Sequence, residues 1–458
     1  MPHITTFEQL DRYLAEAEAL PCDDEKRRAW ATLQADPRLW EDYPARLSGT
    51  DAFSSEYESI VNRFIDHIRG RDYQLADEVL DVDIERLSVT PFPYVTASPE
   101  TVGGFLIAYG HIISVLNLPV PARILDIGSG AGSLTIHLAR MGYDMTCVDV
   151  NPQFIELLRR MTARLPKPPE LLCGDMNSID LNGTYDAILF FESFHHSRDP
   201  AGSLRRLRRH LNASGCFAFA AEPIVDEPCD VVPYPWGPRL DGETLRAIRR
   251  FGWIEWGFTW PYFRELLARE GLTAQRYRNP SSHWADVVIA RAPILLEEGQ
   301  QLDFSAKGQG VQCLNTGWSH PEDFGTWSCE DVADLQFGLG SLPQDAPLTL
   351  TMELTVFLAA GSERREVELS LNGQPAGTWV FEGRSPVRVE RAVLVRSGII
   401  EPAQPVTVSF RITSPVTPKE LGLSSDPRRI GVALSSITVT VGRRSRGLAA
   451  APNRLLGE

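Results

Sequence analysis

The sequence predicts an α/β protein in which a parallel sheet is preceded by a helical region and followed by an antiparallel β-sandwich. Residues 123–151 give a strand, a glycine-rich turn, a helix and a second strand, which is one βαβ unit. Apolar residues recur at helical spacing within residues 1–95, and short β-branched runs separated by Pro and Gly fill residues 348–441. We therefore expect domains at residues 1–95, 96–293 and 302–442, and a mobile tail at residues 443–458.

Composition and charge narrow the class of protein. The 458-residue chain has a net charge of −15 and no basic stripe to neutralise phosphates, which argues against a general nucleic-acid binder. Its seven cysteines form no CxxC pair and no Cys/His cluster at zinc spacing, which indicates reduced thiols. The first residues contain no signal-peptide core, and no stretch approaches the roughly 20 apolar residues of a membrane span. These features predict a soluble cytoplasmic protein.

The N-terminal region, residues 1–95, is expected to be helical. Phe7 and Leu10, and later Ile60 and Phe64, recur at the spacing of one helix face, and acidic residues lie between the apolar ones. Two interpretations stay open for this region. It is either a helical cap packed on the core or a lid over the active site.

The glycine-rich turn of the βαβ unit allows a ligand to approach the backbone closely. Gly128, Gly130 and Gly132 stand at alternate positions, and the backbone can turn sharply there because glycine has no Cβ. Asp149 follows about 20 residues later at the end of the second strand, where a carboxylate accepts hydrogen bonds from ribose hydroxyls. Asp126 would repel a pyrophosphate, and a dinucleotide fingerprint would place its third glycine one position later. The turn therefore suits a nucleoside that carries a cationic group better than it suits NAD.

This acid–glycine run, D-x-G-x-G-x-G, resembles motif I of the class I S-adenosylmethionine (SAM) methyltransferases. In that family the turn holds the amino-acid end of SAM, and the acid at the position of Asp149 holds the ribose. A further acid pairs with the adenine amino group and the next residue packs on the ring, a pattern that Asp175 and Met176 match. The resemblance implies a seven-stranded Rossmann-like sheet over residues of about 95–293, with SAM as cofactor. The implied cofactor contacts are Asp126, Gly128, Gly130, Gly132, Asp149, Val150, Asp175, Met176 and Phe191.

Polar residues follow the predicted strand Tyr185–Phe191, at the edge where an open α/β sheet binds its ligands. His195 and His196 lie just beyond this strand, and Glu222 follows the next one. A hydroxyl has too high a pKa to attack well at neutral pH, so a base should lie within hydrogen-bond reach. The catalytic candidates are His196 first, then His195 and Glu222. The alternative is that the histidines only cap or pack.

The same edge leaves a metal-dependent variant open. Glu192, His195, His196 and Glu222 could converge there, since imidazole and carboxylate hold Mg²⁺ or Mn²⁺. No spacing in the sequence requires a metal, so we predict a metal-free site. Activity that is insensitive to a chelator would agree with that prediction.

Residues 230–260 interleave aromatic rings with Arg and carboxylates. Rings stack on the apolar faces of sugars, while Arg, Asp and Glu bind hydroxyls through paired hydrogen bonds. We therefore expect a substrate-recognition insert, and the alternative is a small aromatic core. The candidate substrate-binding residues are Tyr234, Trp236, Arg239, Asp241, Trp253 and Glu255.

The C-terminal region, residues 302–442, has the short, evenly spaced strands of a β-sandwich. Asn372-Gly373 predicts a hairpin, and Pro375 predicts that the pairing beyond it starts late or lies at an edge. Two segments, residues 317–328 and 420–431, resemble the β-sandwich modules appended to bacterial enzymes of surface-glycan assembly. The resemblance implies binding of a glycan, of a partner enzyme or of a second copy of the chain.

Together these features predict a SAM-dependent methyltransferase that O-methylates a sugar hydroxyl of a glycan, or of its activated precursor, in bacterial surface polysaccharide biosynthesis. One alternative is a methyltransferase on a small natural product or lipid. Another is a non-catalytic glycan-binding scaffold, which would not bind SAM. A hydride-transfer enzyme that uses NAD is the least favoured.

Overall fold

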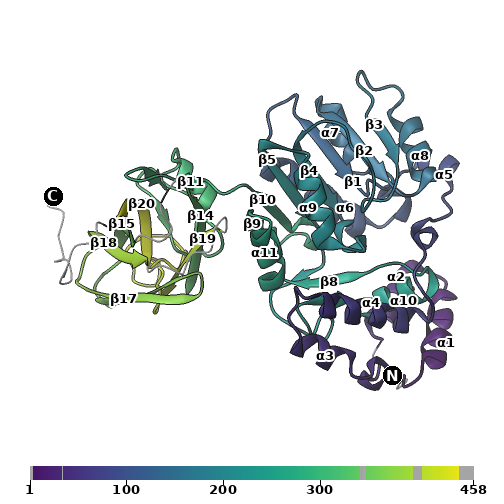
Figure 1. Ribbon diagram of the computed structural model, residues 1–458, viewed down its shortest axis with the longest axis horizontal. Helices are drawn as coiled ribbons and strands as arrows, with labels where there is room; N and C mark the ends of the chain where they lie inside the picture. Colours follow the sequence, from purple (N-terminus) through teal and green to yellow (C-terminus); the bar gives the residue numbers. More distant parts are fainter. Residues whose placement is uncertain (1–3, 34, 341, 343–346, 396–404, 443–458) are drawn as a thin grey trace. The chain divides into compact units, whose positions relative to one another are not determined.

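The computed structural model describes residues 4–33, 35–340, 342, 347–395 and 405–442 (Figure 1). The chain divides into two compact units, residues 1–266 with 277–289 and residues 267–276 with 290–458. The predicted boundary at residue 95 lies inside the first unit, and the predicted domain limits stay predictions. The predicted tail, residues 443–458, lies outside the described residues.

The N-terminal region is helical, as predicted. Thr6 begins α1 with a capping box, and Ser54 caps α4, whose last turn ends at Gly70 in a left-handed conformation. Glu56, Glu58 and Arg63 of α4 face solvent while its apolar face is buried, which is the amphipathic pattern that the sequence shows; Arg69, in the last turn, is buried. The helices are α1 (Phe7–Glu18), α2 (Asp23–Ala31), α3 (Tyr43–Gly49), α4 (Ser55–Arg69) and α5 (Ile84–Val89), with short 3₁₀ turns η1 (Pro37–Trp40), η2 (Leu75–Glu78) and η3 (Tyr94–Thr96).

A seven-stranded sheet forms the centre of the methyltransferase-like region and confirms the Rossmann-like prediction. Its strand order is β3-β2-β1-β4-β5-β10-β9. β1 pairs in parallel with β2 and β4, β2 with β3, and β4 with β5, so the carboxyl ends of these five strands share one edge. The strands are β1 (Arg123–Ile127), β2 (Asp144–Asp149), β3 (Glu170–Cys173), β4 (Tyr185–Phe191), β5 (Leu211–Ala220), β9 (Thr273–Tyr277) and β10 (Val287–Arg291).

Helices cover this sheet and bury its apolar side chains. α6 begins where the Ser98 Oγ accepts a hydrogen bond from the Thr101 N–H at 3.2 Å, which caps the helix. Side chains of α6 and α7 share one hydrophobic cluster with alternate residues of β1, β2, β4, β5 and β10. The helices are α6 (Pro99–Leu116), α7 (Thr135–Met141), α8 (Pro152–Thr162), α9 (Pro200–Arg208) and α11 (Trp260–Arg269).

Helix α6 corrects one detail of the membrane prediction. Its 18 residues have a mean hydropathy of 1.2, so among the described residues this helix is long and apolar enough to cross a membrane. The helix meets this criterion by length and composition only. Its side chains Phe105, Ala108 and Ile112 pack into the core of the sheet. The core helix of a globular domain passes the same test, so α6 is weak evidence for a span.

The insert that follows β5 folds onto the N-terminal helices. It contains α10 (Gly242–Arg250) and a small sheet of β6 (Ile224–Val225), β8 (Trp256–Thr259) and β7 (Trp236–Pro238). The Tyr57 hydroxyl donates to the Trp236 carbonyl at 2.6 Å, and Arg246 pairs with Glu18 at 2.9 Å. These elements lie beside α1, α2 and α4 in Figure 1.

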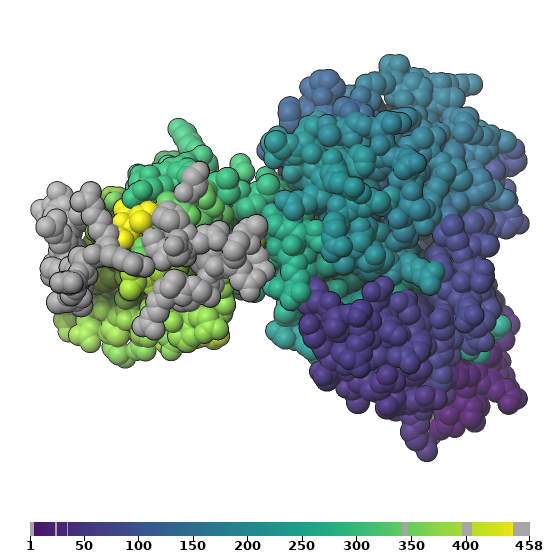
Figure 2. Space-filling model, in the orientation of Figure 1, coloured from purple at the N-terminus to yellow at the C-terminus, as the bar shows by residue number. Residues whose placement is uncertain are grey.

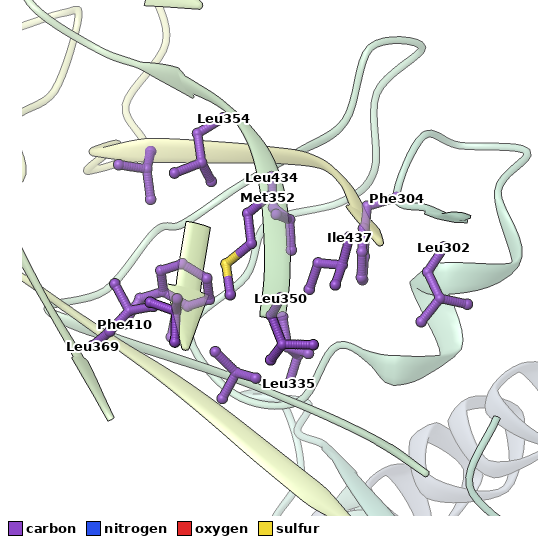
Figure 3. Packing of buried hydrophobic residues seen from close by; sticks show 14 of the residues in the cluster. Leu302, Phe304, Leu335, Leu350, Met352, Leu354, Leu369, Phe410, Leu434 and Ile437 are labelled. Carbon is purple, nitrogen blue, oxygen red and sulfur yellow. The ribbon is translucent and has the colours of Figure 1, made fainter. Parts of the chain in front are cut away.

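The second unit contains two five-stranded sheets that share one hydrophobic cluster (Figure 3). Leu335, Leu369 and Phe410 enter the cluster from one sheet, and Leu350 and Ile437 enter it from the other. The shared core suggests the predicted β-sandwich. One sheet contains β11 (Leu295–Leu296), β14 (Val332–Leu339), β19 (Val406–Ile412), β16 (Arg364–Leu371) and β17 (Gln374–Glu382); the other contains β12 (Gln301–Asp303), β20 (Val432–Val441), β15 (Leu348–Val356) and β18 (Val387–Val395), with β13 (Thr326–Trp327) beside β20.

Local predictions for this unit are confirmed at the β16–β17 hairpin. Asn372 and Gly373 both have positive φ, 46° and 76°, as a tight two-residue turn requires. Pro375 lies on β17, an edge strand, next to a shift in register with β16. The two segments that resemble glycan-assembly modules meet through Arg428, which pairs with Glu322 at 2.9 Å.

Candidate active site

The glycine turn after β1 is as compact as its sequence predicts. Gly128, Gly130 and Gly132 all have positive φ, between 51° and 71°. A Cβ at Gly128 would stand 2.5 Å from the Ser193 Cβ, and one at Gly132 would stand 2.0 Å from a Leu158 methyl group. At Gly130 nothing lies within 4 Å of the Cβ position, so the turn borders open space there. That open space beside bare backbone fits a bound cofactor.

Asp149 and Asp126 lie at the ends of adjacent strands. The Asp149 carboxylate accepts the Gly130 N–H at 2.7 Å and the Asn151 N–H at 2.8 Å, and burial raises its pKa. Asp126 is buried and accepts the Thr135 hydroxyl, and burial raises its pKa to about 6. Asp149 stabilises the glycine turn, beside which a ribose would bind. Asp126 instead contacts the first residue of α7, the helix that follows the turn. Their contacts with SAM stay predictions.

The other predicted cofactor residues surround the same edge. Val150, Met176 and Phe191 are partly exposed, so each offers surface to a ligand. Asp175 accepts the Asn177 N–H at 2.9 Å, which closes the turn after β3. Asp175 therefore has a local structural role besides the predicted contact with adenine.

Glu222 anchors the loop that follows β4. One of its oxygens accepts the N–H groups of Ser193 and Phe194 at 2.9 and 2.8 Å, and the other accepts the N–H and Nδ1–H of His195 at 3.1 and 2.8 Å. Burial would raise the pKa of Glu222, but His195 and these hydrogen bonds lower it. Because the buried carboxylate already accepts four hydrogen bonds, the structure makes Glu222 a positioning residue and does not support it as a general base.

His195 is held as a neutral imidazole. Burial and the neighbouring His196 lower the pKa of His195, and its Nδ1 carries the proton because Glu222 can only accept. Its Nε2 lies 3.7 Å from Glu255, too far for a hydrogen bond. The Nε2 lone pair is therefore the part of this ring that is available for chemistry.

His196 is in the opposite protonation state. Its Nδ1 lies 3.5 Å from Glu78, and its ring lies 4.3 Å from that of His195. Burial would lower the pKa of His196, but Glu78 and Glu255 raise it to about 9. An imidazolium has no lone pair to accept a proton, so the structure does not support His196, the first catalytic candidate from the sequence, as the base.

Glu255 completes a compact cluster with the two histidines. One ligating atom from each of His195, His196 and Glu255 lies within 4.8 Å of the others. Glu255 is buried and also pairs with Arg239. This set differs from the metal alternative considered from the sequence, which combined the histidines with Glu192 and Glu222. Glu192 is exposed to solvent and is not one of the three residues of this cluster.

The insert residues separate into two groups. Tyr234 and Trp236 are buried, with their polar atoms bonded to backbone carbonyls, and Asp241 caps α10 through the Thr244 N–H at 2.9 Å. This placement favours the small aromatic core for these three residues and gives no support to direct contact with a substrate. Arg239, Trp253 and Glu255 lie beside the histidines instead, and the Trp253 Nε1 has no hydrogen-bond partner among the described residues.

Glu78 is a site residue that the sequence did not reveal. One of its oxygens faces His196, and the other accepts the Ile254 N–H at 2.9 Å. Glu78 ends η2 in the N-terminal region, and no motif or periodicity distinguishes it. The space-filling view shows the purple N-terminal residues packed against the blue and teal residues of this unit (Figure 2).

Comparison with known proteins agrees with this geometry. Residues 125–219 match the family model described as a methyltransferase domain. An uncharacterized methyltransferase of Mycobacterium tuberculosis is 37% identical over 100 residues, which are 21% of this chain and 39% of that protein. A ubiquinone biosynthesis O-methyltransferase of Xanthomonas oryzae is 27% identical over 96 residues, which are 20% of this chain and 40% of that protein.

Among solved structures, the magnesium protoporphyrin IX methyltransferase of Synechocystis with bound SAH aligns at a TM-score of 0.34 and 17% identity. The alignment covers 46% of this chain and 94% of that one. The chain spans less than half the length of the curated relatives it matches, so the match concerns one domain. The chain thus contains a SAM-dependent methyltransferase domain in residues 125–219, and SAM is its cofactor.

Proposed function

We propose that this protein transfers the methyl group of SAM to a hydroxyl oxygen. The observation that carries the proposal is the neutral His195 imidazole, which Glu222 orients at the edge of the sheet where the glycine turn and Asp149 also lie. A hydroxyl needs such a base in order to attack, whereas an amine or an activated carbon need not have one. The ubiquinone biosynthesis O-methyltransferase among the relatives supports oxygen as the acceptor atom.

Each residue of the site has a separate role in this reaction. SAM, when bound, supplies an electrophilic methyl group on a sulfonium centre. The His195 Nε2 accepts the hydroxyl proton as the oxygen attacks, and Glu222 stabilises the imidazolium that forms. The rings of Phe105 and Tyr109 pack against Phe191 at the end of β4, and this apolar cluster would help to keep water from the reacting atoms. Alignment of the acceptor supplies much of the remaining rate.

We further propose that the acceptor hydroxyl belongs to a sugar. Trp253 presents a partly exposed ring beside His196, and its buried indole N–H has no hydrogen-bond partner among the described residues. Arg239 and Glu255 form an ion pair next to it, as in sites that bind several hydroxyls. The resemblance of the C-terminal unit to glycan-assembly modules supports a cytoplasmic step of surface polysaccharide biosynthesis. The second candidate is a small natural product or lipid acceptor, which the relative named for ubiquinone biosynthesis supports.

Labelled methyl transfer to a panel of activated sugars, oligosaccharides and phenols tests both levels of the proposal. We expect an O-methylated sugar, its position fixed by mass and linkage analysis. His195→Ala should abolish transfer, while His210→Ala, a change at the opposite edge of the sheet, should not. Product on nitrogen or carbon, or full activity in a folded His195→Ala variant, would refute O-methylation. Product on phenols alone would refute the sugar assignment.

A further inference from the structure

We propose that His195, His196 and Glu255 bind a divalent transition-metal ion at the acceptor end of the site. Their ligating atoms lie within 4.8 Å of one another, and the His195 Nε2 and Glu255 Oε2 atoms are 3.7 Å apart. Metal–ligand bonds of about 2.1 Å place the ligands of a tetrahedral ion roughly 3.4 Å apart. Small side-chain shifts, together with loss of the His196 ring proton to solvent on metal binding, would therefore bring the three ligands to bonding distance.

The first support is that a carboxylate lies beside the Nδ1 of each histidine, hydrogen-bonded to His195 and 3.5 Å from that of His196, where metal-bound histidines have an outer partner. A ligating imidazole usually donates its second N–H to a carboxylate, which fixes the ring and the tautomer. Glu222 lies 2.8 Å from the Nδ1 of His195, and Glu78 lies 3.5 Å from the Nδ1 of His196. The proposed base mechanism uses only His195 and Glu222, so it does not account for the second histidine and the carboxylate beside it.

The second support is the balance of charge around the cluster. The carboxylates of Glu78, Glu222 and Glu255 have side-chain exposures of 10%, 0% and 6%, and Arg239 is the guanidinium paired with Glu255. With His196 deprotonated, as a metal ligand must be, these four groups leave a surplus of two negative charges. Buried charges are costly unless they are paired or bind a metal, and a divalent cation matches this surplus.

The pairing of Glu255 with Arg239 is compatible with coordination. A carboxylate has about four lone-pair sites, so Glu255 can accept from Arg239 and still give one lone pair to a metal. The guanidinium then fixes the orientation of that ligand, as the second carboxylates do for the histidines. Arg239 is in this respect part of the outer shell of the proposed site.

The donor set selects the kind of ion. Two imidazoles and one carboxylate suit Zn²⁺ and neighbouring first-row ions, whereas Mg²⁺ and Ca²⁺ prefer oxygen ligands. Three protein ligands leave a coordination position open, as in catalytic metal sites. This part rests on the proposed O-methylation: the acceptor oxygen would take that position, the ion would lower the pKa of the hydroxyl, and the proton would pass to water instead of to His195.

Metal binding can be measured without any acceptor. The full chain is freed of metal with a chelator and titrated with Zn²⁺ by calorimetry and with Co²⁺ by its visible absorption, with Mg²⁺ as a comparison. We expect one equivalent of Zn²⁺ or Co²⁺ to bind, and the Co²⁺ spectrum to be lost in His195→Ala and His196→Ala. Glu222→Gln and Glu78→Gln should weaken binding about 10- to 100-fold. His210→Ala is the matched control and should bind as the wild type does.

The outcomes separate this inference from the proposed function. No binding of Zn²⁺ or Co²⁺ to the wild type, or binding that is unchanged in folded His196→Ala and Glu255→Gln variants, would overturn the site. Methyl transfer that is unaffected by a chelator would overturn the catalytic part and leave His195 as the base. A bound ion in a protein that methylates no hydroxyl would instead refute the O-methylation and leave the metal site standing.

Discussion

Glu222→Gln is the change whose effect follows most directly from the geometry. The glutamine oxygen can keep the hydrogen bonds from Ser193 and Phe194, and its NH₂ group then faces the N–H and Nδ1 of His195. Two donors cannot bond to each other, so Nδ1 must become an acceptor and the His195 proton moves to Nε2. The lone pair that is proposed to accept the hydroxyl proton is lost, although the ring keeps its place.

The size of the effect can be worked out from the same contacts. The backbone N–H of His195 loses its acceptor, and a buried unsatisfied donor costs about 1–3 kcal/mol. The thermal midpoint should fall by about 2–4 °C for each kcal/mol lost. Loss of the base should lower kcat by about 10²- to 10⁴-fold. The affinity for SAM should change little, because Asp149 and the glycine turn are untouched.

The assay follows S-adenosylhomocysteine formation with a hydroxyl acceptor, together with a thermal melt and a SAM titration of each variant. Glu227→Gln is the control, since this carboxylate is exposed. A folded Glu222→Gln variant with the kcat of the wild type would refute the assignment of His195 as the oriented base. A variant that lost only SAM binding would also refute this assignment, since Glu222 is expected to act only on the acceptor side of the site.

Three further changes test other parts of the site. Gly132→Ala should lower the melting temperature more than Gly130→Ala, because φ is positive at both positions but only at Gly132 would a Cβ stand 2.0 Å from a leucine methyl group; equal losses in paired melts would contradict this. Asp149→Asn should weaken SAM binding about 10- to 100-fold in calorimetry, the equivalent of one hydrogen bond to a charged group, and an unchanged Kd would remove the ribose assignment. The pKa of His196 is raised from 6.5 to about 9, so its stabilisation is complete below pH 6.5 and is lost as the pH rises through 9, by at most about 3 kcal/mol. Glu78→Gln should flatten this part of the curve of melting temperature against pH, and a curve parallel to that of the wild type would speak against the pairing.

Local patterns predicted most of the fold, and they failed where the pattern was absent. The glycine turn, the helices and the Asn372-Gly373 hairpin each depend on residues that are close in sequence. β14 was missed because its run, Val332–Leu339, contains a single β-branched residue, although Ala333, Leu335 and Phe337 alternate with Asp334 and Gln336. β6, β7 and β8 were missed because strands of two to four residues are too short to show a period.

The sequence predicted which residues lie at the ends of the strands, but not how these residues interact in the site. His195, His196 and Glu222 follow two parallel strands, and that alone brings them to one edge. Their protonation states could not be read from sequence, because they depend on which carboxylate each ring meets. His195 meets Glu222 through a short hydrogen bond and stays neutral, whereas its neighbour His196 faces Glu78 and becomes a cation.

The N-terminal region is part of the site, because a few of its residues join the acceptor side to the cofactor side. Glu78 contacts His196 and the Ile254 N–H on the acceptor side. Two residues later, the Leu80 carbonyl accepts from Asn151 at 2.8 Å, and Asn151 lies two residues beyond the strand that ends at Asp149. Displacing this segment would remove the partner of His196 and a support of the proposed ribose site in one movement. Occupancy of the cofactor site should therefore affect the protonation of His196 without any direct contact between them.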